Sequence, residues 1–228
     1  MASTLTTLLG VAVAVLLAWQ LARNLQRAAR RRREAPDRLF ARITPLIENA
    51  HYEDLTKAGY PQLTGSYRNL PVRIHPVIDT LATRKLPALW LLVTLPEPLP
   101  LRATFDLMMR PAGPTTFSNF DHLPFAIRPT ADLPEQAVVR TDDPDHLLPL
   151  HVVAPHLDVF DQPRAKEMLL TPKGARLVWH LAEADRVRYG VFRQAEFGDI
   201  VLDPDLIIAL LDRLIALRQS ILKWSSAQ

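Results

Sequence analysis

Residues 89–95, LWLLVTL, form a continuous apolar run between Pro87 and Pro96. A run of this length, closed by proline at both ends, predicts a central strand that is buried on both faces. Proline is frequent far beyond this run, because 17 of the 20 prolines of the chain lie from Pro61 to Pro172. Proline interrupts helices, so we expect this region to fold into short strands and loops.

Two hairpins are predicted beside this central strand. Asn69-Leu70-Pro71 separates Ser66–Arg68 from the alternating stretch Val72–Asp79, and Pro172-Lys173-Gly174 separates 168–171 from 176–181. Both triplets are typical turn sequences. Two further strands are expected over 101–109 and 187–193, and the irregular segment 110–165 is expected to form a long loop with one short helix near 146–160.

Two helices complete the prediction. Thr44 and Pro45 resemble a helix start and Gly59 a helix end, which predicts a helix over 45–58. Asp203 and Pro204 begin the second helix, over 204–223. The expected fold class is therefore α+β, with a mainly antiparallel sheet of five to seven strands covered by these two helices.

The N-terminal segment is predicted to be a transmembrane helix. Ala2–Ala22 has no charged side chain, and as a helix its 21 residues would span about 31 Å, close to the thickness of a bilayer core. A cleaved signal peptide is the alternative, but the segment lacks a positively charged start and a small residue at the best-placed cleavage site. We expect three parts: the span 1–22, an Arg-rich stalk 23–42 and a folded domain 43–228.

Charge is distributed unevenly along the chain and predicts its topology. The stalk carries eight arginines against Glu34 and Asp37, a balance of +6, so residues 43–228 sum to −3 in a chain of +3. Positive residues stay on the cytoplasmic side of a membrane, so the domain is expected there and the N-terminus outside. A mildly acidic domain does not indicate nucleic-acid binding. The arginines expected to meet anionic lipid headgroups are Arg23, Arg27, Arg30, Arg31, Arg32 and Arg33.

The composition excludes several kinds of chemistry. The chain has no cysteine, which excludes disulfides, thiol nucleophiles and Cys-based metal sites. Its seven glycines are scattered, so neither a phosphate-binding loop nor a dinucleotide fingerprint is present. No cofactor is expected.

One polar cluster could bind a divalent metal. Asp142, Asp143, Asp145 and His146 combine carboxylates with an imidazole, but their spacing does not match a calcium loop. Asp-Asp-Pro-Asp is also a good turn sequence in its own right. We expect these residues to be structural, and no catalytic residue is predicted.

The C-terminal helix carries more apolar surface than one sheet face needs. Its apolar residues follow a heptad spacing, and further apolar residues widen the stripe. Packing on the sheet is expected for most of the stripe, and a surplus edge would contact a partner. The predicted partner contacts are Leu214, Leu217, Ile221 and Trp224.

These observations favour a single-span accessory subunit or scaffold, without catalytic activity, in a bacterial inner-membrane complex of respiratory or photosynthetic kind. Its expected partners are the membrane and other subunits of that complex. Two alternatives stay open at this point: a membrane-tethered enzyme that uses the acidic/His cluster, and a lipid- or ligand-binding module.

Overall fold

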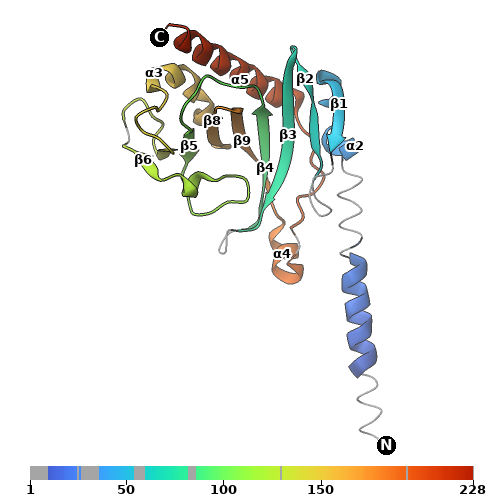
Figure 1. Cartoon of the computed structure of the whole chain (residues 1–228). Helices are drawn as coiled ribbons and strands as arrows, with labels where there is room; N and C mark the ends of the chain where they lie inside the picture. Colours follow the sequence, from blue (N-terminus) through green and yellow to red (C-terminus); the bar gives the residue numbers. More distant parts are fainter. Residues whose placement is uncertain are drawn as a thin grey trace, which may run out of the picture.

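The computed structural model of this chain describes residues 10–24, 26, 36–53, 60–81, 86–128, 130–193 and 195–227. Within them, nine strands form one sheet, and every neighbouring pair is antiparallel. The expected α+β class is thereby confirmed (Figure 1). The strands are β1 (Glu48–Glu53), β2 (Gln62–Tyr67), β3 (Leu70–Asp79), β4 (Ala88–Leu95), β5 (Phe105–Met109), β6 (Phe125–Ile127), β7 (Ala137–Thr141), β8 (Ala165–Thr171) and β9 (Gly174–Glu183), in the order β1-β2-β3-β4-β9-β8-β5-β7-β6.

Three of the predicted strand features agree with the structure. The run 89–95 lies within β4, in the interior of the sheet, and both predicted hairpins form, as β2–β3 and β8–β9. Gly174 turns the second hairpin with φ +142°, and a Cβ there would lie 2.3 Å from the carbonyl oxygen of Leu95. Glycine at this turn therefore allows β9 to pass close to the end of β4.

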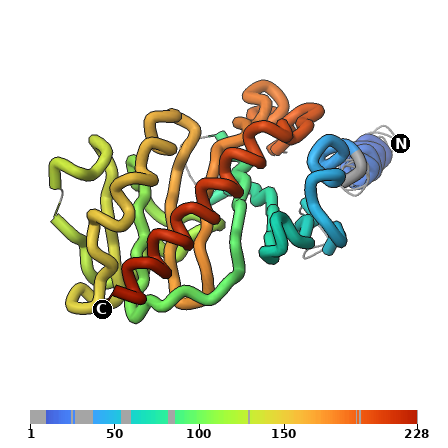
Figure 2. Tube along the Cα trace, turned by 90° about the horizontal axis from the view of Figure 1, so that it is seen from above, coloured from blue at the N-terminus to red at the C-terminus, as the bar shows by residue number. Residues whose placement is uncertain are grey.

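The long C-terminal helix covers one face of the sheet. It is α5 (Pro204–Ser225), which packs on β4 and β9, and Figure 2 shows it running over the strands toward the C-terminus. Asp203 caps it by accepting a hydrogen bond from the backbone N–H of Asp205, as the sequence predicts. Burial of the α5 stripe against the sheet makes the main core.

Smaller helices complete the described chain. The segment 110–165 holds α3 (Leu150–Val153) and η3 (Ala154–Asp161) near the expected position, but it also contributes strands β6 and β7. The sheet is therefore larger than the predicted five to seven strands. The other short helices are α2 (Pro36–Leu39), η1 (Thr44–Leu46), η2 (Phe120–His122) and α4 (Arg186–Phe192).

The predicted helix over 45–58 is wrong. One short turn, η1, is followed by β1, and residues 54–59 lie outside the described part of the chain. β1 pairs with β2, and Ile47 is buried over Gly65, where a Cβ would lie 2.5 Å from its Cγ2. Pairing with a strand that leaves room for Ile47 overrides the local helical pattern.

The predicted strand over 187–193 is also wrong, because this segment forms α4. Pairing of β9 with β4 ends at Glu183, and the Asp185 carboxylate then accepts a hydrogen bond from the Arg188 backbone N–H. This cap starts a helix, which ends at Arg193 in a left-handed conformation with φ 53°.

The N-terminal helix covers residues 10–24 in the described chain. Among the described residues, no helix is long and apolar enough to cross a membrane. The predicted span begins at Ala2, and its residues 2–9 lie outside the described part. Leu39 and Phe40, assigned from sequence to the stalk, belong to the domain core.

Candidate functional site

The face of the sheet opposite α5 carries the polar side chains. Strand register places two rows of residues side by side across it. One row runs through Arg73, Thr94, Arg176, Leu169, Asp106 and Arg140, and the other through His75, Leu92, Val178, Glu167, Met108 and Val138. Side chains alternate between faces along each strand, so both rows point away from α5.

A second, smaller core covers part of this face. Phe117 and Phe120, from the segment between β5 and β6, pack with Leu92, Met108 and Val178. The Phe117 ring lies 5.0 Å from that of Trp90. Segment 111–124 therefore lies across the second row.

Two carboxylic acids are buried on this face of the sheet. Asp106 of β5 is 1% exposed and Glu167 of β8 is 0% exposed. Asp106 pairs with Leu169 across the two strands, so Glu167 is its diagonal neighbour on the same face. The two carboxyl groups lie within hydrogen-bonding reach of each other, and the Ser118 hydroxyl donates to Glu167 Oε1.

The two acids are best described as a pair that holds a proton. Within the described residues, Asp106 Oδ1 and Glu167 Oε2 are buried and accept no hydrogen bond. If Asp106 holds a proton and donates it to Glu167, one oxygen of each carboxyl group gains a hydrogen-bond partner. Burial raises the pKa of Asp106 to about 9, with the Glu167 charge adding to the rise, and burial also raises the pKa of Glu167 to about 7.

A partly buried arginine limits the rise in the pKa of the two acids. The Arg176 guanidinium of β9 is close enough to lower the pKa of both acids, and its Nε donates to Thr94 Oγ1. Burial in turn lowers the pKa of Arg176. The arrangement can store a proton in the sheet, but both acids are covered and neither faces solvent.

The predicted acidic/His cluster lies in the turn after β7, and Asp142 comes two residues after Arg140, the residue that pairs with Asp106. Asp142 accepts hydrogen bonds from the Thr104 backbone N–H at 2.6 Å and from the Thr104 hydroxyl at 2.9 Å. Asp143 accepts from the Asp145 backbone N–H and contacts the His146 ring at 2.7 Å, a contact that lowers the Asp143 pKa. Within the described chain, no three His, Asp or Glu side chains gather as a metal site would require.

These contacts predict different costs for two neighbouring substitutions. Asp142→Ala should lower the free energy of unfolding by about 1 kcal/mol, because it removes both hydrogen bonds to Thr104. Asp145→Ala is the matched control, because only the backbone N–H of Asp145 takes part in the turn contacts among the described residues, and it should change stability by less than about 0.5 kcal/mol. Denaturant unfolding of both variants checks this, and equal losses would contradict the assigned role of Asp142.

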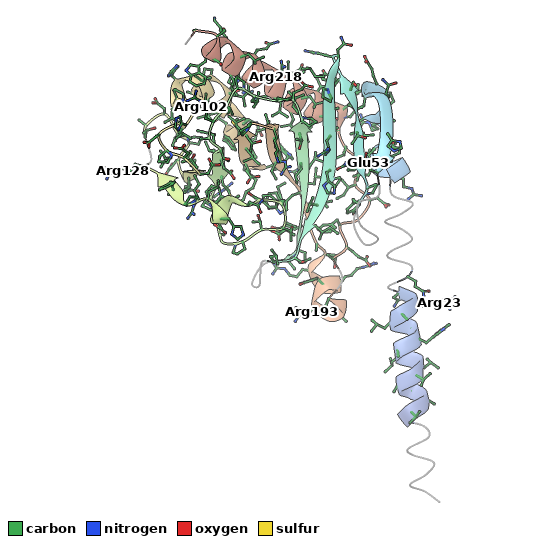
Figure 3. All side chains as sticks on the ribbon, in the orientation of Figure 1. Arg23, Glu53, Arg102, Arg128, Arg193 and Arg218 are labelled. Carbon is green, nitrogen blue, oxygen red and sulfur yellow. The ribbon has the colours of Figure 1, made fainter. Side chains whose placement is uncertain are left out.

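The predicted partner contacts on α5 lie mostly inside the domain. Leu214, Leu217 and Ile221 are each 0% exposed in the main core, and Trp224 is partly buried against it. Only Trp224 among the four is open to a partner without movement of the helix. The predicted lipid-facing arginines are described only in part: Arg23 is exposed near the end of the N-terminal helix, with its guanidinium 4.9 Å from the centre of the Trp19 ring (Figure 3), and Arg27 and Arg30–Arg33 lie outside the described residues.

The buried pair was missed by sequence reasoning. Its only signal is a carboxylate inside each of two largely apolar strands, FDLMM and AKEMLLT. Comparison with known proteins adds nothing to this picture, because neither a family model, nor a curated protein, nor a solved structure matches the sequence.

Proposed function

We propose that this protein is a membrane-anchored accessory subunit or scaffold without catalytic activity, held by one N-terminal span at the cytoplasmic face of a bacterial inner membrane. One observation carries the proposal. Every described side chain of the N-terminal helix, residues 10–24, is exposed. Its large apolar side chains are exposed by 50% or more: Val11, Val13, Val15, Leu16, Leu17, Trp19 and Leu21.

An apolar helix that its own domain leaves uncovered requires another apolar environment. The described helix has a length of about 22 Å, and residues 2–9 before it carry no charged side chain. If the helix includes them, it reaches the thickness of a bilayer core. The arginines that follow would hold the domain on the cytoplasmic side.

The geometry of the domain supports a non-catalytic role. Its acids Asp106 and Glu167 are buried, with Ser118 of segment 111–124 bonded to Glu167, and Asp142 and Asp143 are engaged in turn contacts. A general acid must reach its substrate within hydrogen-bonding distance. The enzyme alternative would therefore need segment 111–124 to move.

A charge within the proposed span tests the anchor. The full chain should stay with membranes after washing at high salt and alkaline pH, and Val13→Lys combined with Leu16→Lys should release it. Each charge near the centre of a span costs about 3 kcal/mol on insertion. Val201→Lys is the control, since Val201 is a 47% exposed apolar residue of the domain, and this variant should stay bound.

Recovery of the unchanged chain in the soluble fraction would contradict the anchor. Extraction in a gentle detergent tests the accessory role separately, because the chain should then co-purify with other membrane proteins. A chain that purifies alone would contradict that role and leave the anchor in place.

A further inference from the structure

Helix α4 presents the most exposed apolar side chains among those described. Val187 is 74% exposed and Val191 is 68% exposed, more than any large apolar side chain described in the N-terminal helix. They stand four residues apart, so they lie on the same face of α4. Leu81, in the connection between β3 and β4, is 51% exposed.

These side chains lie at one end of the sheet. Ala88 pairs with Asp79 on one side and with Glu183 on the other, so β3 and β9 end level with the start of β4. Leu81 follows β3 by two residues and α4 follows β9 by three. The exposed leucine and the two valines therefore lie beyond the same end of the sheet.

The chain enters the domain beside this end. Leu202 donates its backbone N–H to the carbonyl of Leu39 at 3.0 Å, and Arg38 lies 3.9 Å from Asp199. The segment that contains Asp199 and Leu202 follows α4, to which Glu196 connects it through an ion pair with Arg188. Figure 3 shows Arg193 at the tip of α4, on the side of the domain from which the N-terminal helix extends.

Basic side chains surround the exposed valines. Arg186, Arg188 and Arg193 belong to α4 or its end, and the Arg193 guanidinium lies 5.7 Å from the centre of the Tyr189 ring. Among the described residues, neither Arg186 nor Arg193 has a carboxylate within 4.0 Å.

The nearby acids are mostly engaged within the domain. Asp185 caps α4, Glu196 binds Arg188 and Asp199 faces Arg38, whereas Glu183, at the end of β9, is exposed. Apolar side chains flanked by arginines and an aromatic ring are the composition of helices that lie in a membrane interface.

We propose that Leu81, Val187 and Val191, with Arg186 and Arg193, form a second membrane contact that lays this end of the domain on anionic lipid headgroups. This inference rests on the proposed anchor, which holds the same end of the domain near the bilayer. Because the anchor holds this surface at a high effective concentration near the bilayer, a low intrinsic affinity for lipid is enough to keep it bound. At two turns, α4 is too short to span and would lie at the level of the headgroups.

Three single-cysteine variants of the full chain test the contact, since the natural chain has no cysteine. Val191→Cys reports on α4, Ala14→Cys reports on the N-terminal helix, and Lys173→Cys is the control at the opposite end of β9. Each is labelled with an environment-sensitive dye and reconstituted into vesicles of phosphatidylethanolamine and phosphatidylglycerol that contain lipid-borne quenchers. Matched thermal unfolding of the three proteins establishes that they are folded alike.

The dye at 191 should shift to shorter emission wavelength and be quenched at least threefold more than the dye at 173. Arg186→Glu with Arg193→Glu, or neutral phosphatidylcholine vesicles, should reduce this quenching at least twofold while leaving that at 14 unchanged. Quenching at 14 with none at 191 above the control would overturn the second contact alone. Absence of quenching at 14 would overturn the anchor, and equal quenching at 191 in neutral vesicles would overturn the preference for anionic lipid.

Discussion

Stability of this protein should fall as the pH rises from 7.5 to 9, because a buried carboxyl pair must lose its proton. The pKa of Asp106 is raised from an ordinary 3.8 to about 9 and that of Glu167 from 4.5 to about 7, both chiefly by burial. Between the ordinary and the raised values, the folded protein holds protons that the unfolded chain has released. Rising pH therefore favours unfolding across this range.

The pH window is chosen to separate this effect from that of the histidines. Burial lowers the pKa of His75, His156 and His180, so the folded state binds fewer protons there than the unfolded chain. Their contribution makes stability rise with pH, and it is complete just above the ordinary value of 6.5. Above pH 7.5 the remaining proton is that of Asp106.

One retained proton corresponds to about 1.4 kcal/mol per pH unit, so the free energy of unfolding should fall by roughly 2 kcal/mol between pH 7.5 and 9. Asp106→Asn should remove most of this slope, because the amide can donate to Glu167 without titrating. Glu135→Gln, at an exposed position, is the control and should keep the slope. Denaturant unfolding in one detergent across this pH range measures how the free energy of unfolding changes with pH. An equal slope in Asp106→Asn and the unchanged protein would refute the shared proton.

Local signals predicted the elements whose ends are fixed by their own residues. Asp203 and Pro204 start α5 by capping and by a preset backbone angle, and Pro172-Lys173-Gly174 turns a hairpin whose glycine adopts φ +142°. Neither feature depends on distant parts of the chain. Such elements are readable from a short window of sequence.

Elements decided by distant partners were not predictable in this way. Ile47, just before β1, is buried where Gly65 leaves space for it, and β9 stops where β4 begins, which leaves Asp185 free to cap α4. The buried pair has the same origin. Asp106 and Glu167 are 61 positions apart, and only the pairing of β5 with β8 makes them neighbours.

The stripe on α5 provides the second large effect. Leu214 is 0% exposed and belongs to the main core, where α5 packs on the sheet. Leu214→Ala should lower the free energy of unfolding by about 2–5 kcal/mol, because a buried leucine leaves a cavity when it is truncated. Leu222→Ala is the matched control on the same helix, since Leu222 is 36% exposed, and it should cost less than about 1 kcal/mol.

This pair of variants also decides what the heptad spacing on α5 means. If the stripe is a surface seam, Leu214→Ala and Leu222→Ala should lower the free energy of unfolding of the purified chain by similar amounts, and Leu214→Ala should instead weaken partner binding. A core stripe places the cost in folding, and the variant then weakens any complex only in proportion to the folded fraction. Denaturant unfolding of the purified chain distinguishes the two interpretations. A loss below about 1 kcal/mol for Leu214→Ala would contradict burial of this stripe and favour a surface seam. The expected larger loss would show that the spacing serves to pack α5 on the sheet.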